Sequence, residues 1–266
     1  MLELDFAQAS DVGRVRDHNE DYVGHVLPEV PEKEHTHGWL FALADGVGGQ
    51  EQGEVASRTA VETLLTGFRR AARNEALRSL LPRLVQGANE QVFEAGLASK
   101  ARGLAMATTL VACALRFDRV VVSHVGDSRC YLIRHGHPVA LTRDHTVVGQ
   151  QARLGLISAK AAATSETRHV LTRSLGQGMF VGVETSDHLL LPGDTLLLCS
   201  DGLHGAVPAA DTAHIVACNS DLKVAARELI EAANERDGGD NVSVQLIRIR
   251  NVERVGMYRG RPYKLA

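Results

Sequence analysis

The feature that most constrains this chain is a set of short apolar runs, rich in β-branched residues, spread along its length. Such runs predict buried β-strands, because β-branched side chains pack well on a pleated surface. The joint Phe117-Asp118 between two of the runs predicts a tight hairpin and therefore antiparallel pairing. The predicted strands are Trp39–Ala44, Thr108–Leu115, Val120–Val125, Cys130–Ile133, Thr195–Cys199 and Val242–Ile249.

Apolar residues at helical spacing predict three helices, at about Gly53–Phe68, Leu84–Leu97 and Leu222–Asn234. Pro82 is expected to mark the start of the second helix or a break ahead of it, because proline lacks the N–H that a helix interior needs. Clustered strands, followed by helices between later strands, indicate α+β layers rather than strict βαβ alternation. Because no repeat or low-complexity linker divides the 266 residues, we expect a single domain.

Charge and cysteine content exclude several classes of protein. The net charge of −3 gives no basic excess, which argues against nucleic acid or an anionic membrane as an obligatory partner. Four cysteines lie far apart without CxxC spacing, and three of them sit in apolar runs, as is typical of reduced cysteines. The N-terminus lacks the pattern of a signal peptide, and no run approaches the ~18 apolar residues that span a bilayer. We therefore expect a soluble, cytoplasmic protein.

Four aspartates stand at the ends of predicted strands. Asp45 ends the run Phe-Ala-Leu-Ala and precedes Gly-Val-Gly-Gly, while Asp127 and Asp201 end two other runs. Asp240 follows Gly-Gly, just before the last predicted strand. A short carboxylate in such a place can reach a shared cleft while the strand fixes its backbone, and adjacent glycines leave room for backbone carbonyls and water.

One Asp-Gly pair alone is better explained by a turn. Four carboxylates at strand ends favour a site, because carboxylates that converge in one cleft repel each other and need cations to offset the charge. The twelve histidines show no metal-ligand spacing. An oxygen-only ligand set suits Mg²⁺ or Mn²⁺ better than zinc.

A charged segment, Arg16-Asp-His-Asn-Glu-Asp21, lies close to the N-terminus. Beside a metal cluster, the guanidinium of Arg16 would bind a phosphate through two hydrogen bonds, and Glu20 and Asp21 would hold metal-bound waters. A solvated charged loop explains the composition equally well, so the residues alone leave both interpretations open.

Eight motifs along the chain decide between these interpretations. They are Arg16-x-x-Asn19-Glu20-Asp21, Ala44-Asp45-Gly46-x-Gly48-Gly49, Met106-Ala-Thr-Thr109, Val125-Gly-Asp-Ser-Arg129, Leu141-Thr-Arg-Asp-His-Thr146, Leu171-Thr-Arg-Ser-Leu-Gly176, Cys199-Ser-Asp-Gly-Leu203 and Gly239-Asp-Asn-Val-Ser243. In order and spacing they resemble the motifs of the metal-dependent type 2C serine/threonine protein phosphatase family (PPM), and of its compact bacterial branch in particular. The resemblance spans roughly residues 8–249.

This resemblance implies a four-layer αββα sandwich, in which two antiparallel sheets pack together and helices flank them. The phosphatase domain would cover residues 1–250, and the basic tail 251–266 is interpreted as a solvated extension. The implied activity is hydrolysis of phosphoserine and phosphothreonine monoesters on proteins by a metal-activated water, without a covalent intermediate. Phosphorylated proteins, including a serine/threonine kinase or its substrates, are the expected partners of a monomeric enzyme.

The resemblance also implies the metal ligands. Asp45 would bridge two Mn²⁺ or Mg²⁺ ions, and the backbone carbonyl of Gly46 would bind the first. Asp201 and Asp240 would complete the shell of the second ion. Asp127, together with Asp201, is similar to the ligands of a third, weaker site in bacterial members.

The remaining matched residues would support these ligands. Glu20 would contact waters of the first ion and Asp21 would hold waters near the second. Arg16 would hold the substrate phosphate. Thr109 would support the site, and Asn241 would orient its neighbours.

The sequence departs from the family pattern at two positions. Many eukaryotic members carry a histidine, proposed as the proton donor, where Val47 stands here. A metal-bound water is expected to replace it, with His18 as the weaker candidate. The common Gly-Thr-Thr of the family begins with Ala107, a change that the fold is expected to tolerate. The segment Thr146–Thr167 coincides with the family's flap, and its composition fits a short helical excursion or a mobile flap.

Three alternatives remain beside this interpretation. Cys113 and Arg119 have the Cys-x5-Arg spacing of cysteine-dependent phosphatases, but no glycine lies between them to let backbone N–H groups surround a phosphate. A non-enzymatic metal-binding module would keep the fold and lose ligands, whereas Asp45, Asp201 and Asp240 are all present. A phosphatase with one dedicated protein substrate would share the fold and the chemistry, and the sequence does not separate it from a general one.

Overall fold

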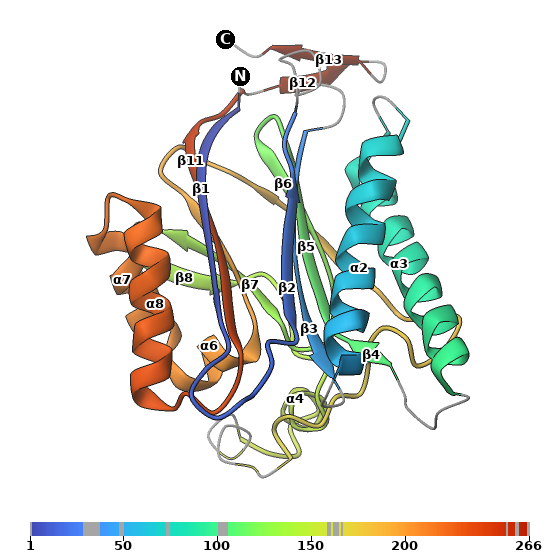
Figure 1. Ribbon diagram of the computed structural model, residues 1–266. Helices are drawn as coiled ribbons and strands as arrows, with labels where there is room; N and C mark the ends of the chain where they lie inside the picture. The colour runs from blue at the N-terminus through green and yellow to red at the C-terminus, as the bar shows by residue number, and fades with distance from the viewer. Residues whose placement is uncertain are drawn as a thin grey trace.

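The computed structural model describes residues 2–28, 38–47, 51–72, 75–100, 106–158, 161, 165, 167–253, 255–258 and 261–264. Two antiparallel β-sheets pack face to face, and helices cover the outer face of each (Figure 1). The α+β fold with two antiparallel sheets and flanking helices is therefore confirmed.

The first sheet has the strand order β1-β11-β10-β7-β8, and every neighbouring pair is antiparallel. Helices α6, α7 and α8 cover its outer face. The strands are β1 (Glu3–Asp11), β7 (Arg129–Arg134), β8 (His137–Ala140), β10 (Thr195–Cys199) and β11 (Val242–Asn251), and the helices are α6 (Asp201–Ala206), α7 (Ala209–Cys218) and α8 (Leu222–Arg236).

The second sheet has the order β2-β3-β5-β6-β9, with the short strand β4 paired to β3. Two long antiparallel helices, α2 and α3, cover its outer face (Figure 1). The elements are β2 (Asp21–Val26), β3 (Trp39–Val47), β4 (Ala107–Thr108), β5 (Leu110–Arg116), β6 (Arg119–Val125), β9 (Glu184–Leu189), α2 (Glu51–Arg70) and α3 (Leu77–Lys100).

The central strands are apolar on both faces because each lies between two cores. In β3, Leu40 and Ala42 face the helices α2 and α3, while Phe41 and Leu43 face the other sheet, and all four are fully buried. Strands buried on both faces lose the polar–apolar alternation of a surface strand. This burial explains the continuous apolar runs from which the strands were predicted.

The predicted hairpin between β5 and β6 is confirmed. Arg116 pairs with Arg119, and Phe117 between them takes a positive φ of 61°. Helix α4 (Val147–Arg153) confirms a helical excursion in the segment 146–167, and Thr146 caps it by accepting a hydrogen bond from the N–H of Gly149. Several residues of that segment lie outside the described part of the chain.

The tail forms a separate hairpin, β12 (Val255–Tyr258) with β13 (Arg261–Lys264). Strand β11 ends at Asn251, so the predicted boundary at residue 250 falls at its end. Among the described residues, no helix combines the length and the apolar composition needed to cross a bilayer.

The predicted helix start or break near Pro82 is wrong. Helix α3 runs through Pro82 from Leu77 to Lys100. The leucines at 80, 81 and 84 all pack in the core beneath α2 and α3. Burying each of them contributes about 2 kcal/mol, which offsets the hydrogen bond that proline cannot make.

Replacing this proline tests that explanation. Pro82→Ala should raise the free energy of unfolding by about 1 kcal/mol or more, because alanine restores the N–H donor and a helical backbone. Gly87→Ala on the same helix is the matched control: its added methyl meets nothing within 4 Å, and we expect a gain of about 0.5–1 kcal/mol. Urea melts measure both. If the free energy of unfolding rose in Gly87→Ala but fell in Pro82→Ala, the helix would need proline at position 82.

Candidate metal and phosphate site

The predicted site residues meet at one end of the sandwich, where strands of both sheets end. A cavity of about 150 Å³ opens there. All predicted site residues except Asp21 and Thr109 line it, and so do three residues that were not predicted as site residues. Its lining is Arg16, Glu20, Asp45, Gly46, Val47, Asp127, His169, Leu171, Asp201, Asp240 and Asn241.

Asp45 is fixed by its backbone. Its N–H donates to Oγ1 of Thr109 (3.0 Å), and its carbonyl accepts from the N–H of Thr109 (2.8 Å) and from Oγ1 of Thr108 (2.8 Å). Oγ1 of Thr109 also lies 2.7 Å from Oγ of Ser128, next to Asp127. Thr109 therefore lies behind the cavity wall and links two of the loops that carry aspartates.

Asp21 lies beside Asp45, its partner across the β2–β3 ladder. Its Oδ2 accepts a hydrogen bond from Oγ of Ser200 (2.7 Å), the residue before Asp201. Its Oδ1 is buried without a hydrogen-bond partner among the atoms of the described residues. An unpaired carboxylate oxygen in the interior is costly, so this atom points to a ligand from outside the chain.

Asn241 joins the N-terminal loop to the loop before β11. Its Oδ1 accepts from the N–H of Glu20 (2.8 Å), and its Nδ2 donates to the carbonyls of Val12 (2.8 Å) and His18 (2.9 Å). Its own N–H donates to Oδ1 of Asp240 (2.9 Å). Asn241 thus fixes the loop that carries Glu20 through its side-chain amide and contacts the carboxylate of Asp240 through its backbone N–H.

Gly46 permits a close approach between β3 and the start of α2. A Cβ at Gly46 would overlap the carbonyl oxygen of Gly53, and a Cβ at Gly53 would overlap the carboxylate of Glu20. The two glycines therefore let α2 and Glu20 close on the end of β3. Gly48 and Gly49 of the same motif lie outside the described residues.

Arg16 and Asp240 form an ion pair, with 2.8 Å between Nη2 and Oδ2. Their side chains are 49% and 38% exposed. Ion pairs this exposed stabilise a protein by at most about 1 kcal/mol. The guanidinium of Arg16 can therefore leave Asp240 and bind another anion at little cost in free energy.

Two histidines at the site were not predicted as site residues. Nε2 of His204, one helical turn after Asp201, donates to the carbonyl of Asp127 (3.0 Å), and burial lowers the pKa of His204 to about 4, so it is neutral. Nδ1 of His169 lies 3.4 Å from Oδ2 of Asp201. The spacing of one turn was a usable signal for His204, whereas nothing local in the sequence marks His169.

The carboxylates change one another's pKa values. Burial, together with the neighbouring aspartates, raises the pKa of Asp45 well above its ordinary value. Burial likewise raises the pKa values of Asp21 and Asp127, each to about 7. Burial also opposes ionisation of Asp201, yet hydrogen bonding by His169 leaves its pKa lowered. Buried oxygen ligands that repel one another in this way fit divalent hard cations such as Mg²⁺ or Mn²⁺.

A separate group, His124, His145 and Glu184, brings three potential ligand atoms within 4.8 Å of one another. The two imidazole rings stack with centroids 4.7 Å apart and an interplanar angle of 15°. Their ring nitrogens therefore direct their lone pairs within two nearly parallel planes, an arrangement that does not favour convergence on one ion. Nδ1 of His145 already accepts the N–H of Gly126 (3.1 Å). The aspartate cluster is the better site for a hard cation.

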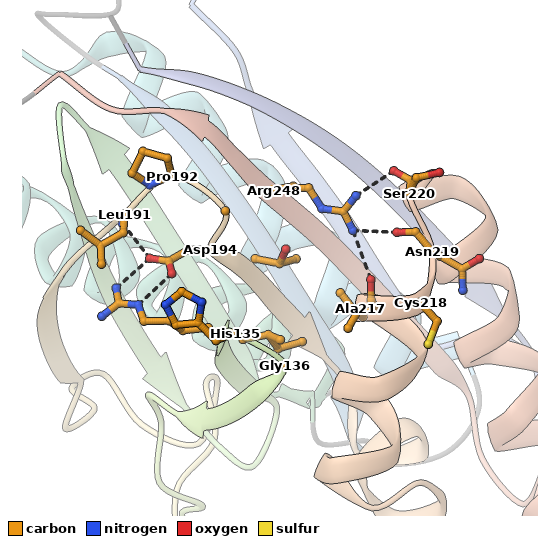
Figure 2. Close-up of a pocket in the computed structure, with 15 residues that line it drawn as sticks. His135, Gly136, Leu191, Pro192, Asp194, Ala217, Cys218, Asn219, Ser220 and Arg248 are labelled. Atoms are coloured by element: carbon orange, nitrogen blue, oxygen red, sulfur yellow. Dashed lines mark hydrogen bonds and ion pairs between the residues drawn. The ribbon is translucent and has the colours of Figure 1, made fainter.

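A larger cavity, of about 410 Å³, lies at the opposite ends of β7, β10 and β11 (Figure 2). Its charged groups are engaged within the protein. Arg134 pairs with Asp194 (2.7 Å), and Arg248 donates to backbone carbonyls at the end of α7, among them Asn219 (2.9 Å) and Ser220 (2.7 Å). None of the predicted site residues lines it.

A family model described as protein phosphatase 2C matches residues 16–236. The chain belongs to this family. The serine/threonine phosphatase stp of Listeria innocua is 36% identical over 256 residues, which are 95% of this chain and 96% of the relative. The predicted family is thereby confirmed, and the chain is a serine/threonine protein phosphatase of the metal-dependent class.

Solved structures agree with this assignment. The S. agalactiae serine/threonine phosphatase superposes with a TM-score of 0.84 at 30% identity, over 93% of this chain and all of that one. The catalytic domain of the phosphatase PstP, in complex with two manganese ions, gives a TM-score of 0.79 at 31% identity, over 94% of this chain and all of that one.

Metal-free protein should show the raised pKa of the buried Asp21 carboxyl as a pH dependence of stability. A carboxylate whose pKa is raised by folding stabilises the folded state below its unfolded pKa and loses that contribution as pH rises through the folded value. For Asp21 this window runs from 3.8 to about 7. In EDTA, wild type should therefore lose roughly 1 kcal/mol per pH unit relative to Asp21→Asn across the window.

Urea melts of both proteins at several pH values give this difference directly. The comparison removes the opposing contribution of buried histidines, which both proteins share. If the difference in free energy of unfolding between the two proteins stayed constant between pH 4 and 7, the raised pKa of Asp21 would be contradicted.

Proposed function

We propose that Asp45, Asp201 and Asp240, with the carbonyl of Gly46, hold two Mn²⁺ or Mg²⁺ ions, and that Asp127 contributes to a third site. The observation that carries this proposal is the convergence of these carboxylates on one cavity, where burial and neighbouring aspartates raise the pKa of Asp45, while Oδ1 of Asp21 has no hydrogen-bond partner among the described residues. When bound, the ions supply charge stabilisation at the phosphoryl oxygens and an activated water at neutral pH.

The chain's own residues bind and orient the substrate. Arg16 exchanges its exposed ion pair with Asp240 for the phosphate of a phosphoserine or phosphothreonine, which it binds with two parallel hydrogen bonds. Asn241 and Thr109 hold the loops that present the carboxylates. Glu20 and Asp21 orient water beside the ions. Because water is the nucleophile, no covalent phosphoenzyme forms.

The proton donor to the leaving alkoxide is not a side chain at position 47. Val47 lines the cavity and has no proton to give, and His18 is exposed and does not line it. We propose that water in the site supplies this proton, as the sequence led us to expect.

The cysteine-dependent alternative conflicts with the geometry. Cys113 is fully buried in β5, and burial raises its pKa, so the thiolate that such a mechanism needs is disfavoured. Arg119 pairs with Asp187 at 2.8 Å. A non-enzymatic module is disfavoured because Asp45, Asp127, Asp201 and Asp240 all line the cavity.

The enzyme acts on phosphorylated proteins. We propose in addition that a serine/threonine kinase or its substrates are among them, and that residues 1–250 act as a monomeric phosphatase domain followed by the tail 251–266.

A cytoplasmic location is supported by the cysteines 113, 130 and 199, which are buried without disulfides, as expected in a reducing compartment.

The test is hydrolysis of a phosphothreonine peptide with Mn²⁺, which EDTA should stop. Asp45→Asn should lower kcat at least about 100-fold, because it removes the shared ligand. The variant should remain at least as stable as wild type in EDTA, since it also removes a repelling charge. Asp118→Asn, at the far end of the β5–β6 hairpin, is the matched control and should keep wild-type kcat. Turnover in EDTA, or wild-type kcat in Asp45→Asn, would contradict the proposal.

A further inference from the structure

His169 reaches the site from a segment that is tied to the base of helix α4. The carbonyl of Val170 accepts from the N–H of Val147 (2.9 Å), and the N–H of Thr172 donates to the carbonyl of His145 (2.7 Å). These two bonds hold residues 170–172 against the start of the flap. His169 therefore enters the cavity on an element separate from the strands that carry the aspartates.

The neighbouring arginine defines which nitrogen of His169 carries the proton. Nε of Arg168 is always protonated and donates to Nε2 of His169 at 2.8 Å. Nε2 must therefore accept, so the proton of the neutral imidazole sits on Nδ1. That nitrogen is the one that lies 3.4 Å from Oδ2 of Asp201.

We propose that His169 is a positioning residue for Asp201: its Nδ1–H holds Oδ2 and so leaves the other carboxylate oxygen directed to the ions. This inference rests on the proposed metal site. Residues that orient a ligand by hydrogen bonding typically change metal affinity 10- to 100-fold when they are removed. Since the imidazole is 55% exposed and its hydrogen bond is long, we expect the low end of that range.

The same contact ties the flap segment to the site. Asp201 opens helix α6, and His169 belongs to the segment that pairs with the start of α4. The 3.4 Å contact between them links the end of the flap to a proposed metal ligand. Losing it should loosen residues 167–172 even in protein without metal.

Two amide variants separate positioning by Nδ1 from a general need for a polar side chain. Asparagine places its amide nitrogen near the position of Nδ1, whereas glutamine extends to the position of Nε2. Titration calorimetry with Mn²⁺ should give an affinity about tenfold lower than wild type for His169→Ala and His169→Gln. For His169→Asn it should stay within about threefold of wild type.

The matched control is His135→Asn, in the cavity of Figure 2 at the other end of the sheet. His135 has a φ of 52°, a conformation that asparagine tolerates, so this variant should bind Mn²⁺ as wild type does. Hydrogen exchange in EDTA gives a readout without metal: the amide of Thr172 should exchange faster in His169→Ala and unchanged in the control.

The outcomes distinguish this inference from the proposed function. Wild-type protein that fails to bind Mn²⁺ would overturn the metal site itself. The positioning role would be overturned, with the site left intact, if His169→Ala bound Mn²⁺ with wild-type affinity. It would also be overturned if His169→Gln kept the wild-type affinity and His169→Asn did not. Unchanged exchange of Thr172 in His169→Ala would overturn the tie between the flap and Asp201.

Discussion

Mutual repulsion among buried carboxylates is the constraint on which the rest of this structure depends. Burial and like charge raise the pKa values of Asp21, Asp45 and Asp127, which meet at one end of the sandwich beside Asp201, whose pKa is lowered. A cluster of this kind is tolerated only when the surrounding structure fixes it and when cations offset the charge. We therefore expect metal binding to stabilise the folded state of this protein.

The two-sheet architecture provides that fixation. Asp45, Asp127 and Asp201 each lie at or beside the end of a strand whose middle is buried on both faces, so the backbones that carry these carboxylates are firmly held. Thr109 and Asn241 then join these ends by hydrogen bonds that cross between loops far apart in sequence. The site is rigid at its base, and the flap side contacts it through His169.

The sequence was most informative where burial is complete. The central strands are apolar on both faces, so runs such as Trp39–Ala44 were predicted, and the aspartates at their ends were predicted with them. Strand β9, Glu-Thr-Ser-Asp-His-Leu, was missed because it lies at a sheet edge with half-exposed side chains, and its pairing with β6 is imposed by the fold. The half-exposed edge strand β1 was missed for the same reason.

The resemblance predicted the metal ligands, but it could not predict contacts particular to this chain. The ion pair between Arg16 and Asp240 depends on how two loops meet, and so does the contact of His169 with Asp201. The predicted helix start or break near Pro82 was wrong for a related reason. The packing of α3 against the core outweighs the local preference of proline to end a helix.

The most direct test of the central claim is to locate the ions. Crystals grown with Mn²⁺ and measured at the manganese absorption edge would show each bound ion as an anomalous peak. The account predicts two strong peaks within bonding distance of the carboxylates of Asp45, Asp201 and Asp240, with no peak of similar height beside His124 and His145. A strong peak at the histidine pair, with none at Asp45, would contradict it.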